Sequence, residues 1–348
     1  MIEISKITAS VSDLPLKEPF ETAKGRKTSS PAVVMEMQLS NGVTAFGAAT
    51  PVKYVTGEDV QSVLSAVGMC QGDLIGLDPR SYRAVFNVLG EALPDDPSAR
   101  AGLEIAAVDA FCKLYNLPMC RFFGGALDAV ETDLTIPITS PENARQLAKE
   151  AAAKGFTSLK VKVGSADIDE DIARVRAMSE GAPGCAILAD ANQGFVPTAA
   201  VGFVHTLLNA GVKLDMLEQP VDYQDLDGLR YVTQHTSIPV FADESAQTPA
   251  DVIKLVELNA VDGINIKLMK SGISGALDII AICRAAQKEL MLGSMIESAF
   301  GFSASVHLAA GTGVFSRLDL DSHLLLAEQP GTSGLFTAEG PILRPDAG

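Results

Sequence analysis

Two lysines stand two positions apart in the segment "SLKVKVG", residues 158–164. The apolar residues that alternate with them are typical of a buried strand, and side chains at positions i and i+2 of a strand point to the same face. Lys160 and Lys162 are therefore predicted to enter the interior of a sheet together. Burial of an unpaired ammonium group costs several kcal/mol or lowers its pKa. The two lysines thus indicate a functional site. The alternative is an edge strand on which both side chains are solvated.

Four later segments end in a polar residue at nearly regular intervals. Asp190 ends "LAD", Glu218 ends "MLE", Asp243 ends "FAD" and Lys267 ends "NIK". The successive steps from Lys162 are 28, 28, 25 and 24 residues, which suits one strand, one helix and their loops. We expect these side chains to recur at one height around a ring of parallel strands, where barrel enzymes carry their chemistry.

The three carboxylates of this series, Asp190, Glu218 and Asp243, would converge and repel one another. A divalent cation removes that repulsion, and an all-oxygen set of ligands favours Mg²⁺, with Mn²⁺ as a substitute. No His or Cys lies in the series, which disfavours zinc. The sequence therefore predicts a magnesium site formed by these three residues.

Lys162 and Lys267 are four strands apart in a predicted ring of eight, so they are expected to face each other across the barrel. Two bases on opposite sides of one carbon suit a 1,1-proton transfer, in which one base removes a proton and the other returns it to the opposite face. The substrate would be a carboxylate with an acidic α-carbon, and the cation would stabilise the enediolate. Lys160 is predicted to stay charged and to stabilise the developing oxyanion.

Short apolar strands alternate regularly with amphipathic helices from about residue 130 onward. Eight strands and seven intervening helices are predicted, with Ser140-Pro141 and Thr248-Pro249 as helix starts. The pattern predicts an α/β fold, a modified TIM barrel of the form (β/α)7β. An open doubly wound sheet is the alternative, and it is disfavoured because no glycine-rich phosphate fingerprint follows a strand.

The region before the predicted barrel does not alternate strands with helices. Residues 1–50 are predicted to form strands with a hairpin turn at Asn41-Gly42, and helical periodicity follows from Asp59 to Gly124. We therefore expect an α+β capping domain over residues 1–125, a barrel over 126–324 and a C-terminal segment over 325–348.

Composition excludes several classes of partner. The formal net charge is −16 over 348 residues, which argues against nucleic acid and against an anionic membrane surface. The N-terminal segment lacks a basic region followed by an apolar run, and no apolar run reaches the length of a membrane span, so a cytoplasmic protein is expected. The five cysteines are odd in number and scattered, which predicts reduced thiols.

These motifs resemble those of the enolase superfamily, in its muconate-lactonizing-enzyme subgroup. The resemblance rests on "KVKV", the carboxylate series and "INIKLMKSG", and it covers nearly the whole chain. It implies a barrel of seven β/α units and an eighth strand, and a capping domain to which the tail from about residue 325 returns. It also implies Mg²⁺-dependent proton abstraction by lysine, which is known chemistry of this superfamily.

Asp319 and Asp321, in "DLDS", resemble the Asp-x-Asp motif with which dipeptide epimerases hold the free α-ammonium group of the substrate. Two carboxylates at a barrel mouth also favour a cation on electrostatic grounds. The resemblance implies an enzyme similar to L-Ala-D/L-Glu epimerase, which inverts the α-carbon of the C-terminal residue of a dipeptide. The alternative roles of the pair are a helix cap or an ion pair with Arg317 or Lys270.

Further substrate-binding residues are predicted from their positions. Thr135 and Glu297, on the first and seventh strands, would line the pocket, and Asn192 would support Asp190. The resemblance assigns recognition of the substrate side chain to the capping segments "FETAKGRKTSS" and "VKYVTGED". There an anionic side chain would meet Lys24, Arg26, Lys27 or Lys53, whereas a cationic one would meet Glu58 or Asp59.

Other functions remain open on sequence alone. o-Succinylbenzoate synthase and N-succinylamino-acid racemase, of the same subgroup, would use the same lysines and carboxylates, but their substrates lack the ammonium group that the Asp-x-Asp pair would hold. A catalytically silent metal-binding barrel would bind Mg²⁺ without proton exchange, and a Schiff-base aldolase would form an imine on Lys162 or Lys267. We expect a homo-oligomer, of a size that the sequence does not indicate.

Overall fold

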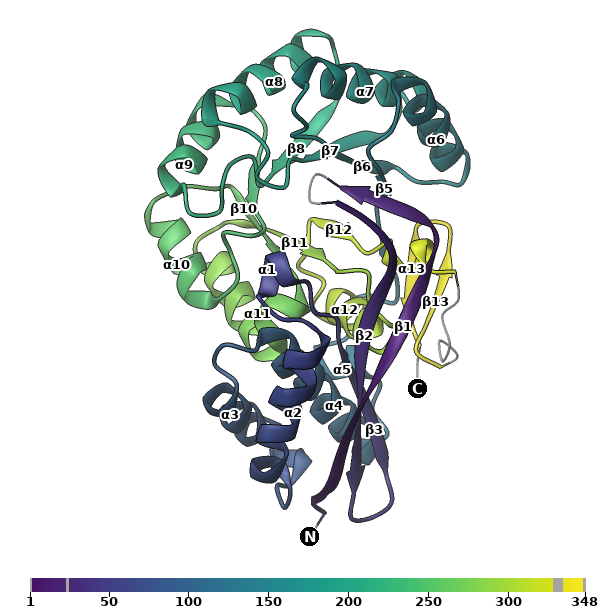
Figure 1. Ribbon diagram of the computed structural model, residues 1–348, viewed down its shortest axis with the longest axis vertical. Coiled ribbons are helices and arrows are strands. Elements are labelled where there is room, and N and C mark those ends of the chain that lie inside the picture. Colours follow the sequence, from purple (N-terminus) through teal and green to yellow (C-terminus); the bar gives the residue numbers. More distant parts are fainter. Residues whose placement is uncertain (1, 23–24, 328–333, 347–348) are drawn as a thin grey trace.

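Eight parallel strands surround an apolar interior in the computed structural model, which describes residues 2–22, 25–327 and 334–346 (Figure 1). The strands pair in chain order, and a hydrogen bond of 3.0 Å from the Asp133 amide to the Leu318 carbonyl joins the last strand to the first. The strands are β5 (Leu134–Ile136), β6 (Ser158–Lys162), β7 (Ala186–Asp190), β8 (Leu214–Glu218), β9 (Val240–Ala242), β10 (Gly263–Ile266), β11 (Glu289–Gly293) and β12 (Arg317–Asp319).

Seven helices cover the outside of the barrel, and the predicted (β/α)7β architecture is confirmed (Figure 1). The hydroxyls of Ser140 and Thr248 cap their helices as predicted, because each accepts a hydrogen bond from an amide of the first turn. Among the described residues, no helix combines the length and the hydropathy that a membrane crossing needs. The helices are α6 (Pro141–Ala153), α7 (Ile168–Gly181), α8 (Pro197–Asn209), α9 (Leu226–His235), α10 (Pro249–Glu257), α11 (Leu268–Ala285) and α12 (Ala299–Thr312).

Side chains that point into the barrel form two layers of different chemistry. The lower layer is an apolar cluster of Leu188, Met216, Phe241 and Met291. Two positions further along three of these segments stand the three carboxylates of the predicted metal site, which therefore point to the same interior. On β11 the corresponding position is Gly293, where a Cβ atom would lie 3.0 Å from Lys267 Cε. The missing side chain of this glycine makes room for the lysine.

An antiparallel sheet and a layer of helices form the capping domain. The sheet consists of β1 (Ile4–Thr22), β2 (Gly25–Leu39) and β3 (Thr44–Ala49), and the turn predicted at Asn41-Gly42 joins β2 to β3. The hairpin of β1 and β2 extends from the capping domain to the barrel opening (Figure 1). The helices are α1 (Lys53–Thr56), α2 (Val60–Leu74), a 3₁₀ turn (Pro79–Ser81), α3 (Tyr82–Ala92), α4 (Pro97–Tyr115) and α5 (Met119–Phe122).

A buried carboxylate connects the capping domain to the barrel. Glu104 of α4 is fully buried and accepts hydrogen bonds from the Ser274 amide, at 2.9 Å, and from the Ser274 hydroxyl, at 2.6 Å. Gly272 has a φ of +66°, and a Cβ atom there would lie 2.5 Å from Glu104 Oε2. Only glycine fits this left-handed bend of α11 beside the carboxylate.

The C-terminal segment contacts both parts of the molecule. Leu326 pairs with Leu16 of β1, and the Ala327 amide donates to the Pro15 carbonyl at 2.9 Å. This segment follows the short helix α13 (Ser322–Leu325). The last strands, β13 (Phe336–Glu339) and β14 (Ile342–Pro345), instead form a small sheet with β4 (Val130–Glu131), just before the first barrel strand.

Gly47 of β3 lies where the capping sheet packs closely on α4, which leaves no room for a side chain. A Cβ atom at Gly47 would lie 2.0 Å from the Gly102 carbonyl oxygen and 2.7 Å from the Ala106 amide nitrogen. We expect Gly47→Ala to destabilise the protein by about 1–3 kcal/mol, because the backbone of α4 would have to move. Gly68→Ala, on the exposed face of α2 with nothing within 4 Å, is the control and should be neutral or slightly stabilising. Urea denaturation of both variants checks this, and an equal effect of the two would contradict it.

Candidate active site

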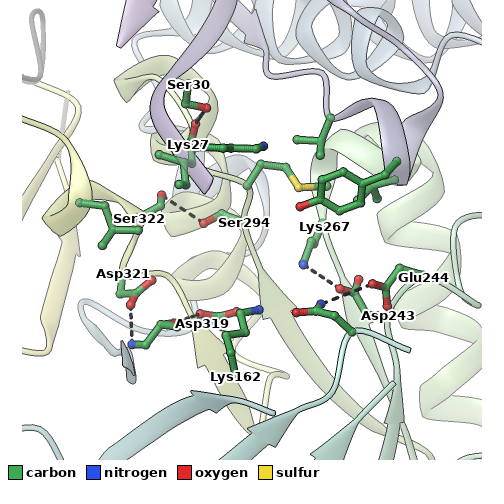
Figure 2. A pocket seen from close by; sticks show the side chains of 18 residues that line it. Lys27, Ser30, Lys162, Asp243, Glu244, Lys267, Ser294, Asp319, Asp321 and Ser322 are labelled. Atoms are coloured by element: carbon green, nitrogen blue, oxygen red, sulfur yellow. Dashed lines mark hydrogen bonds and ion pairs between the residues drawn. The ribbon is translucent and has the colours of Figure 1, made fainter. Parts of the chain in front are cut away.

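A cavity of about 110 Å³ lies at the carboxyl ends of the barrel strands, between the barrel and the capping domain (Figure 2). It brings together most of the side chains that the sequence singled out, and three more of them lie buried directly beneath it. The capping domain contributes Lys27, Ser30, Val52, Tyr54 and Val55, and the barrel contributes the predicted residues Thr135, Lys162, Asn192, Asp243, Lys267, Asp319 and Asp321.

Lys160 lies beneath the cavity with 1% of its side chain exposed. Its Nζ is 2.7 Å from Glu218 Oε2, 2.7 Å from Asp319 Oδ2 and 3.1 Å from Asp190 Oδ2. Burial lowers the pKa of Lys160, but the surrounding carboxylates outweigh burial and raise it well above its ordinary value. The chain therefore tolerates this buried ammonium group because it is paired with carboxylates from three strands.

Lys162 and Lys267 enter the same cavity from β6 and from the end of β10, four strands apart (Figure 2). Lys162 Nζ donates to Asp190 Oδ2 at 2.6 Å, and Lys267 Nζ donates to Asp243 Oδ2 at 2.8 Å. Burial lowers the pKa of Lys267, but Asp243 outweighs burial and raises it. Each lysine is thus held by a different carboxylate of the predicted metal site.

A third lysine, Lys270, holds Asp243 from the opposite side. Its Nζ donates to Asp243 Oδ1 at 2.6 Å, to the Asp243 carbonyl at 2.7 Å and to the Asn265 carbonyl at 2.9 Å. Burial raises the pKa of Asp243, but Lys267 and Lys270 keep it below its ordinary value. The structure therefore does not support an ion pair between Lys270 and the Asp-x-Asp pair. The other partner considered for that pair, Arg317, bonds to Asp215 and Glu289.

Glu218 shares the Lys160 ammonium group with two other carboxylates. Asn265 Nδ2 donates to Glu218 Oε1 at 2.8 Å, and Lys160 Nζ lies 2.7 Å from Oε2, but Lys160 is shared with Asp190 and Asp319. Burial and the nearby Asp190 outweigh Lys160 and raise the pKa of Glu218 to about 7. A hard divalent cation would supply the missing charge, and none of the described residues that line the cavity is His or Cys. The residues present therefore fit Mg²⁺.

The ion pairs with lysine set the present spacing of these carboxylates. Among the described residues, the three acidic side chains whose oxygens lie within 4.8 Å of one another are Asp133, Asp319 and Asp321, not the predicted ligands. Lys162 draws Asp190 toward one side of the cavity, and Lys267 draws Asp243 toward the other. A shared cation would therefore require these two ion pairs to open.

The Asp-x-Asp pair lies beside the first strand, with Asp133 behind it. The Thr135 amide donates to Asp321 Oδ2 at 2.6 Å, and the Thr135 hydroxyl donates to Asp319 Oδ1 at 3.3 Å. Burial and the neighbouring Asp319 raise the pKa of Asp321 to about 6. Neither carboxylate oxygen of Asp133 has a hydrogen-bond partner among the described residues. This part of the cavity is short of positive charge, which suits an ammonium group.

The remaining predicted residues are placed differently. Glu297 is buried but does not line the cavity, because its Oε1 accepts from the Met295 amide at 3.0 Å within its own loop. Lys27 lines the cavity, with its Nζ 5.5 Å from the centre of the Tyr54 ring. Lys24 and the side chain of Arg26 lie outside the described residues.

Glu58 and Asp59 serve as helix caps and do not face the cavity. Glu58 accepts hydrogen bonds from the amides of Ser98 and Ala99 at the start of α4, and Asp59 caps α2. Lys53 is exposed and lies 3.7 Å from Asp59. The two acidic residues that were considered for a cationic substrate side chain therefore have structural partners instead.

Two family models together span nearly the whole chain. The first, described as mandelate racemase / muconate lactonizing enzyme, N-terminal domain, matches residues 5–124, and the second, enolase C-terminal domain-like, matches residues 143–347. The chain belongs to the mandelate racemase / muconate lactonizing enzyme family of the enolase superfamily. The resemblance inferred from the lysine and carboxylate motifs is thus confirmed.

Similar members of this family are dipeptide epimerases. The L-Ala-D/L-Glu epimerase of Thermotoga maritima is 38% identical over 99% of each chain. A substrate-liganded L-Ala-D/L-Glu epimerase from Bacillus subtilis superposes with a TM-score of 0.96 at 34% identity, over 99% of this chain and 98% of that one. A dipeptide epimerase of Enterococcus faecalis, solved with Mg and L-Leu-L-Tyr, gives a TM-score of 0.95 at 35% identity, over 99% and 98%.

The raised pKa of Asp321 predicts a pH-dependent cost in stability. Below pH 3.8 its carboxyl is protonated in both the folded and the unfolded states, whereas above about pH 6 the folded state must bury its charge. Stability should therefore fall as the pH rises through this window. We expect Asp321→Asn to be more stable than the parent at pH 8 by about 3 kcal/mol, with little difference at pH 3.5.

Urea denaturation at both pH values measures this difference. Asp128→Asn removes the same charge from a side chain that is 99% exposed, so it should leave stability nearly unchanged at either pH. A parent that is more stable than Asp321→Asn at pH 8 would contradict the prediction.

Proposed function

We propose that the protein is a Mg²⁺-dependent dipeptide epimerase that inverts the α-carbon of the C-terminal residue. One observation carries the proposal: Lys162 and Lys267 approach a single cavity from strands four apart, above buried carboxylates and opposite an Asp-x-Asp pair. The similarity to dipeptide epimerases over the full length of the chain supports the same assignment.

The two lysines would act as the acid and the base of a 1,1-proton transfer. One lysine would take the α-proton, and the other would deliver a proton to the opposite face of the same carbon. For either lysine to act as a base, its ammonium group must first lose a proton, so its ion pair with Asp190 or Asp243 must open. Lys160 stays charged and would stabilise the negative charge that develops on the substrate carboxylate.

Asp190, Glu218 and Asp243 would hold Mg²⁺, and Asn192 would support Asp190, because its amide donates to Asp190 Oδ1 at 3.0 Å. When bound, the cation supplies positive charge that stabilises the enediolate, and Mn²⁺ would substitute for Mg²⁺. The other end of the dipeptide would bind at Asp319 and Asp321, which face the cavity from its opposite wall (Figure 2).

The Asp-x-Asp pair also separates this function from its nearest alternatives. The substrates of o-succinylbenzoate synthase and N-succinylamino-acid racemase carry no free ammonium group, so they give no reason for two buried carboxylates at this wall. Thr135 orients both carboxylates toward the cavity, which supports a cationic partner there. A dipeptide supplies that partner as its α-ammonium group.

Lys27 is the charged side chain that the capping domain contributes to the cavity among the described residues. An anionic or an uncharged substrate side chain is therefore favoured over a cationic one. The cytoplasmic location and the homo-oligomer remain predictions from the sequence.

Incubation with a dipeptide library in D₂O tests the proposed activity. We expect one deuterium to enter the α-position of the C-terminal residue of accepted dipeptides, with inversion, as followed by mass spectrometry and NMR. A silent metal-binding barrel would show no exchange, and an aldolase would be trapped on lysine by borohydride in the presence of a carbonyl substrate.

Single lysine variants should show which face of the α-carbon each lysine serves. We expect Lys162→Met and Lys267→Met each to lose epimerisation by about 10²–10⁴-fold, while each still exchanges the α-proton of one epimer, a different one in each variant. Lys149→Met, on the exposed face of α6, is the control and should keep full activity. Two variants that exchange the same epimer would contradict bases on opposite faces.

The ammonium site is tested with blocked substrates. We expect Asp321→Asn to raise the KM for an accepted dipeptide by about tenfold or more, because a buried charge pair is lost. The parent should turn over the N-acetylated dipeptide with a much lower kcat/KM than the free dipeptide. In Asp321→Asn, acetylation should lower kcat/KM little further. An equal penalty for acetylation in both proteins would show that Asp321 does not bind the ammonium group.

A further inference from the structure

Glu244 is a buried acidic residue of the cavity that the three predicted ligands do not include. It directly follows Asp243, is 4% exposed, and lies beside Asp243 and Lys267 in the cavity wall (Figure 2). Among the described residues, its Oε2 has no hydrogen-bond partner, and no Lys, Arg or His nitrogen lies within 4.0 Å of the carboxylate. A buried carboxylate oxygen without a partner is costly, so it points to a ligand that the chain does not supply.

Asn192 connects Glu244 to a predicted ligand on another strand. The amide of Asn192 donates to Asp190 Oδ1 at 3.0 Å, and its side-chain Nδ2 lies 3.4 Å from Glu244 Oε1. Asn192 has a left-handed backbone with a φ of 41°, which turns the chain after β7 back toward the cavity. One residue therefore links Asp190, which ends β7, to Glu244, which follows β9, on the side of the cavity where the cation is proposed.

Asp243 and Glu244 differ in the partners of their oxygens. Both oxygens of Asp243 already accept hydrogen bonds, Oδ2 from Lys267 and Oδ1 from Lys270. Lys270 is fully buried and also bonds to the carbonyl of Asp243, so it would stay in place when Lys267 turns to a substrate. The loop after β9 therefore carries Asp243, whose two oxygens are bonded to lysines, and Glu244, whose Oε2 has no hydrogen-bond partner among the described residues.

We propose that Glu244 is a fourth acidic group of the cation site, and that it supplies charge and an oxygen atom alongside Asp190, Glu218 and Asp243. The inference rests on the proposed function for the presence of the cation. It goes beyond that function because it adds a residue on which the affinity for the metal depends, whether or not a dipeptide is bound.

Titration of the full-length protein with Mn²⁺ alone tests the proposal, since the electron paramagnetic resonance signal of free Mn²⁺ falls as the ion binds. We expect Glu244→Gln to weaken Mn²⁺ binding by about 10–100-fold, as loss of a partner around a metal site commonly does. Glu244→Asp restores the charge on a shorter side chain, and it should recover most of the affinity. Thermal denaturation of each variant verifies that it is folded.

Glu297→Gln is the matched control. Glu297 is also buried and also has an Oε2 without a hydrogen-bond partner among the described residues, but it does not line the cavity. Its variant should bind Mn²⁺ as tightly as the parent. Unchanged binding by Glu244→Gln, or an equal loss in Glu297→Gln, would overturn the inference. A parent that binds no Mn²⁺ would instead overturn the metal site of the proposed function.

Discussion

The buried ammonium group of Lys160 is the interaction on which the rest of the site depends. It lies within 3.1 Å of carboxylates from β7, β8 and β12, which belong to both halves of the cavity. Asp190 and Glu218 face the proposed metal site, whereas Asp319 faces the proposed ammonium site. Without this charge, three buried carboxylates would repel one another across the barrel, and their ionisation would be strongly disfavoured. Lys160 therefore allows two anionic subsites to exist side by side in one small cavity.

The barrel separates the chemistry from the stability of the fold. Apolar side chains fill the interior below the polar ring, and the polar side chains follow at the next inward-pointing positions of the same segments. This period of two places the functional groups at or just beyond the ends of rigid strands, above close-packed residues, with Lys270 on α11 as an exception. The ring itself is costly, since Glu218 and Asp321 are buried with raised pKa values, and that cost is typical of active sites. The surrounding strands, helices and capping domain offset it.

The sequence predicts the barrel and its ring well because both follow from repeats along the chain. The nearly regular steps between Lys162, Asp190, Glu218, Asp243 and Lys267 reflect one β/α unit each, so the spacing alone places them at one level. Asp133 was missed, although it stands two positions before Thr135, directly before β5, where the period of two would have found it. Lys270 could not be found in this way, because its side chain turns back from a helix to Asp243.

Glu297 shows why the spacing can also predict a site residue wrongly. The loop after its strand turns the side chain away from the cavity. Likewise, Glu58 and Asp59 have the composition of a substrate-binding loop, but the ends of α4 and α2 need their carboxylates as caps. In both cases, backbone amides compete with a substrate for the same carboxylate. Sequence patterns locate the charged residues, but only the positions of helix ends and loop amides decide which of these residues remain available.

The same kind of competition would link metal binding by Asp243 to the base strength of Lys267. Asp243 raises the pKa of Lys267, so in the lysine-paired arrangement this side chain is a poor base. If Asp243 held the proposed cation, Lys267 would lose the partner that holds its proton, and burial would then lower its pKa. Lys270 keeps Asp243 in position during this exchange, because two of its three hydrogen bonds go to backbone carbonyls. Under the proposed function, the arrangement would therefore release a base only when the cation that stabilises the enediolate is also bound.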